Sequence, residues 1–174
     1  TPFSGAWLQT HVGRDPETVT FESRYHGYWG ASVFSVAVAD LDNDGDLDII
    51  TGEHLEGDYQ IKVWQNDGTP FDGEPETEHW TWQPTAVCVD APWMGSSVYH
   101  VIPVDINGDG YQDLISASGE FYETVVWEND GRPFGSVISD TTWVRHNLGR
   151  YTNDGALAVA AGDLDADGDA DVVH

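Results

Sequence analysis

The chain has 174 residues, 40% of them hydrophobic and 12% aromatic, which is enough apolar material for one globular domain with a buried core. Its formal net charge of −25 argues against nucleic acid and anionic membrane surfaces as partners, and no apolar run is long enough for membrane insertion. The single cysteine excludes a disulfide within the chain.

The acidic residues are concentrated in a segment that occurs three times along the chain. Its copies read VAVADLDNDGDLDIIT at 36–51, VIPVDINGDGYQDLIS at 101–116 and VAAGDLDADGDADVVH at 159–174. The acidic parts of these copies, residues 40–48, 105–113 and 163–171, hold 13 of the 31 Asp and Glu. Their first aspartates are 65 and 58 residues apart, which indicates a repeated supersecondary unit.

The residue pattern of each repeat predicts short β-strands, which follow one another in the same order in all repeats. The expected first strands are 33–40, 98–105 and 157–163, and each leads through an acidic loop into a second strand. Third strands are expected at 59–66 and 123–129, and fourth strands, led by tryptophan, at 80–87 and 143–149. Val, Ile, Tyr and Trp dominate these runs, and no helical period is present. Four-stranded antiparallel units of about 60 residues are typical of β-propeller blades.

The predicted fold is therefore all-β, with about three propeller-type blades in one repeat domain, residues 1–174. Its expected parts are a terminal strand and connection at 1–32, a first blade at 33–92, a second at 93–150 and a partial third at 151–174. Propellers use four to eight blades, so closure within one chain is not expected. Two explanations stay open. The chain is a processed form or a piece of a longer propeller, as a start at Thr1 rather than Met suggests, or other copies complete the assembly.

The nine-residue acidic loops have the pattern of a metal-binding turn. Oxygen-bearing side chains occupy positions 1, 3, 5 and 9 of every loop, glycine occupies position 6, and position 7 is expected to offer only its backbone carbonyl. Hard oxygen ligands at this spacing favour Ca²⁺ over Zn²⁺, copper or Mg²⁺. We predict three Ca²⁺ sites, with these ligands: Asp40, Asp42, Asp44, Asp46 and Asp48; Asp105, Asn107, Asp109, Tyr111 and Asp113; Asp163, Asp165, Asp167, Asp169 and Asp171.

Position 12 distinguishes these loops from the helical EF-hand. It holds Thr51, Ser116 and His174 in place of a bidentate glutamate, and the flanking segments are strands. Calcium is therefore expected to clamp a β-turn rather than to open a pair of helices. The alternative interpretation is an acidic, solvated turn without a metal.

The loops and their flanking apolar strands resemble the FG-GAP and VCBS repeats found in integrin alpha-chain propellers and in many secreted microbial proteins. The resemblance covers nearly the whole chain, and its most specific part is DxDxDGxxD between two apolar strands. It implies a calcium-bearing β-propeller, usually extracellular or at the cell surface, and no single activity. Asn107 replaces an aspartate in the second loop, which implies a less charged and weaker site.

Three aromatic residues precede the repeats at matching places and are candidates for ligand binding. Trp29, Trp93 and Tyr151 lie 11, 12 and 12 residues before the first aspartate of their loops, in connections that reach one rim of a propeller. Aromatic rings there can stack on sugars, or they can cap the core. No GxSxG, HExxH, P-loop or dinucleotide motif is present, and no carboxylate pair stands apart from the loops, so nothing indicates catalysis.

The predicted function is that of a non-catalytic, extracellular, calcium-binding propeller module with a structural, self-assembling or adhesive role. Its expected partners are other copies of the chain or the remainder of a longer propeller, and possible ligands are a glycan or a protein. The alternative is the propeller portion of a polysaccharide-active enzyme, or a glycan-binding, lectin-like module.

Overall fold

The computed structural model describes residues 32–54, 61–66, 68, 84–87, 97–118, 123–134, 143–150 and 156–174. These residues form ten β-strands and no helix, and thus no helix that could cross a membrane. Two sheets have four strands each and a third has two, and every strand pair is antiparallel. Within the described part of the chain, the sheets do not close into a ring. The all-β prediction with propeller-type blades is confirmed.

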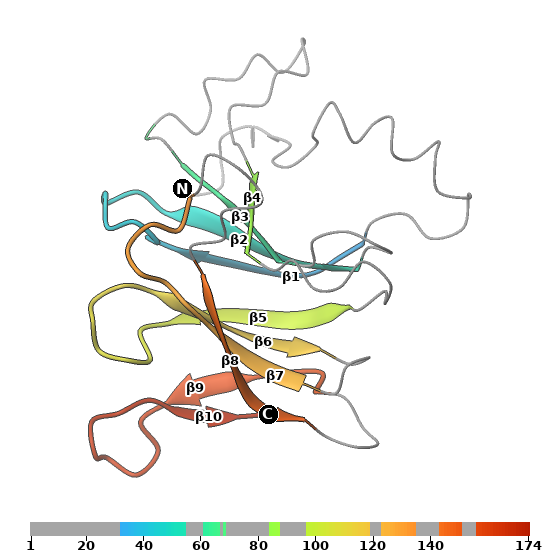
Figure 1. The fold of residues 1–174 in the computed structure, drawn as a ribbon, viewed down its shortest axis with the longest axis vertical. Coiled ribbons are helices and arrows are strands. Elements are labelled where there is room, and N and C mark those ends of the chain that lie inside the picture. Colours follow the sequence, from blue (N-terminus) through green and yellow to red (C-terminus); the bar gives the residue numbers. More distant parts are fainter. Residues whose placement is uncertain are drawn as a thin grey trace, which may run out of the picture.

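The strands follow the order of the repeats. The first sheet contains, in spatial order, β1 (Ser32–Ala39), β2 (Asp48–His54), β3 (Ile61–Trp64) and β4 (Pro84–Ala86). The second contains β5 (Val98–Val104), β6 (Asp113–Ser118), β7 (Glu123–Glu128) and β8 (Val144–Arg150). The third is a hairpin of β9 (Ala160–Gly162) and β10 (Asp171–Val173). The three sheets are stacked in chain order, and the loop that joins the first two strands of each lies at the same edge (Figure 1).

The first two sheets have the same strand register, and the first strand of each has an irregularity at the same place. Val36 pairs with Thr51 in the first sheet, and Val101 pairs with Ser116 in the second. The register shifts between Val33 and Ser35 and, at the equivalent place, between Val98 and His100. Such bulges re-aim the side chains that follow them. The rings of the extra residues, Phe34 and Tyr99, lie with their centroids 5.1 Å apart.

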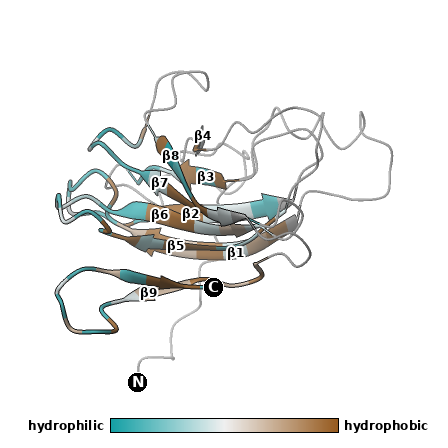
Figure 2. Cartoon of the chain, turned by 60° about the horizontal axis from the view of Figure 1, so that its bottom comes forward, coloured by the Kyte–Doolittle hydropathy of each residue, from teal (hydrophilic) through white to brown (hydrophobic). Residues whose placement is uncertain are grey.

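The core forms two layers, one on each face of the second sheet. Successive side chains of a strand point to opposite faces, so Leu114 packs with Ile50 and Val63 of the first sheet, whereas Ile115 packs with Val159 of the third repeat. Hydrophobic residues fill the middle of the strands, and hydrophilic residues mark the loop tips (Figure 2). The second sheet is thus covered on both faces, which holds the loops of neighbouring repeats side by side.

Candidate metal centres

The three acidic loops share an unusual backbone that the sequence supports at most positions. Positions 4 and 6 of each loop adopt positive φ angles: Asn43 59° and Gly45 98°, Gly108 74° and Gly110 92°, Ala166 64° and Gly168 99°. Glycine adopts this conformation without strain and asparagine tolerates it, whereas alanine does not favour it. The identical path shows that the three loops are structural equivalents.

The aspartate at position 1 organises each loop by accepting backbone hydrogen bonds. Asp40 accepts from the amides of Asp44 at 3.1 Å and Gly45 at 3.0 Å. Asp105 and Asp163 accept from the amides at positions 5 and 6 of their own loops in the same way. These bonds fix the turn and leave the position 1 carboxylate at its centre.

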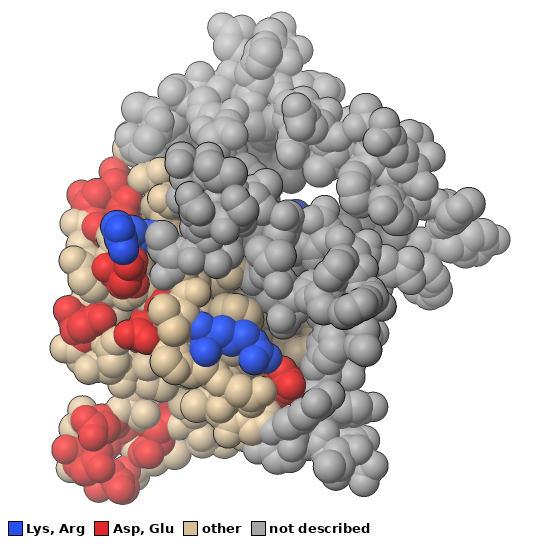
Figure 3. Space-filling view, in the orientation of Figure 1, with Lys and Arg blue, Asp and Glu red and all other residues tan. Residues whose placement is uncertain are grey.

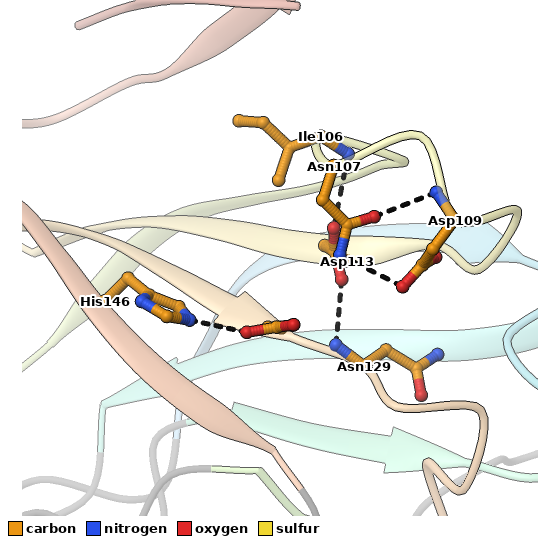
Figure 4. A network of polar contacts seen from close by, with 7 residues as sticks. Ile106, Asn107, Asp109, Asp113, Asn129 and His146 are labelled. Carbon is orange, nitrogen blue, oxygen red and sulfur yellow. Dashed lines mark hydrogen bonds and ion pairs between the residues drawn. The ribbon is translucent and has the colours of Figure 1, made fainter.

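The aspartate at position 9 is the buried anchor of the first two loops. The Asp48 carboxylate accepts from the amides of Leu41 and Asn66, both at 2.9 Å. Asp113 accepts in the same way from Ile106 at 3.2 Å and Asn129 at 2.8 Å (Figure 4). Both aspartates are fully buried.

Burial changes the acidity of these anchors. Loss of hydration disfavours the charged carboxylate more than the amide hydrogen bonds favour it, and the pKa of Asp48 is raised to about 6. The pKa of Asp113 is raised for the same reason. A cation beside either carboxylate would reverse this effect by favouring the charged form.

Carboxylate oxygens converge in the first and third loops. One oxygen from each of Asp40, Asp42 and Asp48 lies within 4.8 Å of the other two, and Asp163, Asp165 and Asp171 form a matching group. Within the part of the chain that the structure describes, the second loop has no such group of three acids. The remaining aspartates at positions 5 and 7 of the first and third loops lie outside these groups.

Asp42 provides the test of whether the first group fits a cation. Its Oδ2 accepts a hydrogen bond from Gln65 Nε2 at 2.9 Å, but its Oδ1 is buried and has no hydrogen-bond partner among the described residues. Burial, followed by the charge of Asp44, raises the pKa of this carboxyl. A buried carboxylate oxygen without a partner is costly, and a hard cation held by three carboxylates would satisfy it. The first donor set therefore fits Ca²⁺.

The second loop satisfies its side chains internally. Asn107 Nδ2 donates to Asp109 Oδ2 at 3.0 Å, and the Asp109 amide donates back to Asn107 Oδ1 at 3.0 Å (Figure 4). The other oxygen of Asp109 accepts from the amide of Tyr111 at 2.9 Å. The amide group of Asn107 thus donates to the Asp109 carboxylate where a cation would otherwise interact with it, and the weaker metal site implied for this loop stays a prediction.

In the first two repeats, the hydroxyl at position 12 binds the side chain of a tryptophan. Trp64 Nε1 donates to Thr51 Oγ1 at 3.3 Å, and Trp127 Nε1 donates to Ser116 Oγ at 2.9 Å. Both tryptophans are buried. A hydroxyl at this position therefore satisfies an indole N–H in the core, which explains why no glutamate is needed there.

Contacts between the loops were not predicted from the sequence. Asn43 Nδ2 donates to the carbonyl of Gly110 at 3.1 Å, which joins the first loop to the second. Asn129 Nδ2 donates to the carbonyls of Leu41 at 2.8 Å and Gln112 at 3.2 Å, so it bridges both loops from the end of β7. Asn-Asp-Gly follows both third strands, at residues 66–68 and 129–131. This repetition was the available signal for a further role of the asparagine, because a turn alone does not require asparagine in both repeats.

Acidic side chains gather along the edge where the three loops lie (Figure 3). That edge is where the predicted metal ligands are stacked, one loop per repeat (Figure 1). The aromatic candidates Trp29, Trp93 and Tyr151 lie outside the described residues, as does residue range 1–31.

Comparison with known families matches the same segments. A model of the FG-GAP-like repeat matches residues 105–174, and a model of the FG-GAP repeat matches residues 32–69. The matched ranges contain all three acidic loops. Searches of curated proteins and of solved structures each gave no match.

Proposed function

Because the chain belongs to the FG-GAP repeat family, we propose that it is a non-catalytic, extracellular, calcium-binding module of β-propeller type. Its role is structural, self-assembling or adhesive, and its partners are further propeller repeats or other copies of the chain. The observation that carries the calcium proposal is the buried Asp42 Oδ1 without a hydrogen-bond partner, beside the carboxylates of Asp40 and Asp48.

Each loop would hold one Ca²⁺ through its side chains at positions 1, 3, 5 and 9 and its backbone carbonyl at position 7. The bound ion supplies positive charge that offsets repulsion among the loop carboxylates. The protein contributes the rest: the amide bonds to Asp40 and Asp48 hold the turn in place, and β2 anchors it in the core. Since the folded form alone presents this arrangement, calcium stabilises the fold by mass action.

The most direct test is thermal unfolding of Asp42→Asn in calcium and in chelator. With calcium the variant should melt below the wild type because a charged ligand is lost. In chelator it should melt at the same temperature or higher, because the substitution removes a partly buried charge that lies near Asp44.

Asp46→Asn is the matched control, since it makes the same change in charge at position 7, where only the backbone carbonyl is expected to bind. It should shift the melting temperature equally in calcium and in chelator. An equal loss in both conditions for Asp42→Asn would contradict metal binding by this side chain.

The enzyme alternative makes a different prediction for the same purified chain. Turnover of a polysaccharide would support it, and binding of a glycan without turnover would support a lectin-like module. Neither outcome is expected from a structural module.

A further inference from the structure

The residues that follow the third strand hold the acidic loop in the same way in the first two repeats. The backbone amide of Asn66 donates to the position 9 carboxylate of Asp48. The backbone amide of Asn129 donates likewise to Asp113. Each asparagine also donates from its side chain to the carbonyl at position 8 of its loop. The residue directly before each asparagine therefore has an equivalent place beside the loop.

These preceding residues are Gln65 in the first repeat and Glu128 in the second, and they have different partners. Gln65 Nε2 donates to Oδ2 of Asp42, the position 3 residue, at 2.9 Å. Glu128 Oε2 instead lies 2.6 Å from Nε2 of His146, which belongs to β8 (Figure 4). The amide of the first repeat thus contacts its loop, whereas the carboxylate of the second contacts the neighbouring strand.

The position 3 residues differ in the opposite sense. The first repeat has the carboxylate of Asp42 in the loop and the amide of Gln65 after the strand. The second repeat has the amide of Asn107 in the loop and the carboxylate of Glu128 on the strand. Each pair carries one negative charge, so the two repeats differ in where this charge lies and not in its amount.

The hydrogen bond from Gln65 decides which oxygen Asp42 can offer to a cation. The bond occupies Oδ2, while Oδ1 is buried and has no hydrogen-bond partner among the described residues. The terminal torsion of an aspartate is otherwise broad, so an unrestrained carboxylate would exchange its two oxygens. Partners that orient metal ligands in this way typically change metal affinity about 10- to 100-fold.

We propose that Gln65 is a positioning residue of the first calcium site, and that the exchange of amide and carboxylate between loop and strand makes the second site the weaker one. This inference rests on the proposed function, because it concerns calcium in these loops. Gln65 orients Asp42, whose carboxylate converges with those of Asp40 and Asp48. In the second repeat Glu128 has no N–H to donate, so an aspartate at position 3 would lack this orienting bond.

Calcium titration of the full chain, followed by NMR, tests the proposal one loop at a time. One glycine amide in each loop donates to the position 1 aspartate and reports on its own site; these are Gly45, Gly110 and Gly168. Gln65→Met keeps the length of the side chain and removes its donor. It should weaken calcium binding at Gly45 by about 10- to 100-fold and leave the titration of Gly168 as in the wild type.

Glu128→Gln is the matched control, because it changes the equivalent residue, whose side chain contacts β8. Alone it should leave the titrations of Gly45 and Gly168 unchanged. Combined with Asn107→Asp it rebuilds the pair of the first repeat in the second loop. The double variant should bind calcium at Gly110 at least about tenfold more tightly than Asn107→Asp alone. A residue that only stabilises the sheet would not transfer affinity to another loop in this way.

Two results would overturn the proposal while calcium binding by the wild type upholds the proposed function. One is an unchanged titration of Gly45 in Gln65→Met, and the other is an equal gain at Gly110 from Asn107→Asp with and without Glu128→Gln. If no glycine amide of the wild type responds to calcium, the proposed function fails and this inference fails with it. Circular dichroism in chelator verifies that each variant is folded, and if Gln65→Met does not fold, the gain at Gly110 decides alone.

Discussion

The side-chain amide of Asn43 donates a hydrogen bond to the backbone carbonyl of Gly110 at 3.1 Å, so the first acidic loop directly contacts the second. Gly110 precedes Tyr111, whose carbonyl is the predicted position 7 ligand. An ion that fixes the first loop would therefore also favour the binding conformation of the second. The equivalent residue of the second loop, Gly108, has no side chain to reach the third loop in this way.

Calcium binding to the first and second loops should consequently be coupled through Asn43. Asp42→Asn, which weakens the first site, should also lower calcium affinity at the second, and this secondary loss should disappear in an Asn43→Gly background. Glycine keeps the positive φ angle of 59° accessible and removes only the contact. A double-mutant cycle read by calorimetry measures the coupling. Ala166→Gly makes a comparable change in the third loop and should leave the coupling intact; coupling that survives Asn43→Gly would disprove the role of this contact.

Ala166 is the one strained residue at position 4 of the loops. Its φ angle of 64° lies in the left-handed region, which is unfavourable for alanine. Glycine would relieve this strain, and its greater backbone entropy in the unfolded chain offsets only part of that stabilisation. We expect Ala166→Gly to stabilise the third loop by about 0.5–1 kcal/mol. Hydrogen exchange of residues 163–171 in chelator measures the effect. Gly168→Ala, at a φ angle of 99°, should do the opposite, and stabilisation by both variants would contradict the explanation.

Stability should depend on pH with opposite slopes in chelator and in calcium. In the ion-free fold the pKa of Asp48 is raised to about 6, above its value in an unfolded chain. Folding then favours the protonated form, so ion-free stability falls as the pH rises through about 6 and recovers toward pH 4. Calcium binds the carboxylate, so affinity and the stability it confers increase over the same range.

Melting temperatures recorded between about pH 4 and 8 test this pair of slopes. Asp48→Asn should remove much of the dependence in chelator, while the raised pKa of Asp113 leaves a remainder of the same sign. Parallel slopes in the two conditions would show that the buried aspartates do not bind the ion.

The hydrogen bond from the Val159 amide to His100 Nδ1, which joins the third repeat to the second, should contribute measurably to local stability. His100→Ala removes the acceptor of the Val159 amide, which should weaken docking of the third repeat by about 1 kcal/mol. Faster hydrogen exchange across residues 156–174 would report it. His100→Ser introduces a hydroxyl like that of Ser35, which accepts from the Val101 amide at the junction of the first two repeats, and should restore part of the protection. Ser35→Ala is the control at the other junction, and it should leave residues 156–174 unaffected.

The sequence carried enough information to predict the strands and the loops, but not the contacts between repeats. Alternating apolar residues and the recurring Asp-Gly pattern are local signals, and they led to the confirmed all-β fold. Asn129 and Leu41 are joined by a hydrogen bond across 88 positions, and Ser35 reaches Val101 only because a bulge redirects its side chain. Such contacts depend on how sheets stack, which no local pattern specifies. The role of Thr51 as an indole acceptor was hidden for the same reason.

The second sheet buries Leu114 on one face and Ile115 on the other, whereas, among the described residues, the first sheet and the hairpin each pack against the second sheet alone. In a linear stack of this kind, neither face of the middle sheet meets water until an outer repeat detaches. Local unfolding should therefore proceed from the ends inward, and the amides of β6 should be the last to exchange. The position of a repeat in the stack thus determines when it unfolds under heat, denaturant or mechanical force, and the second repeat unfolds last.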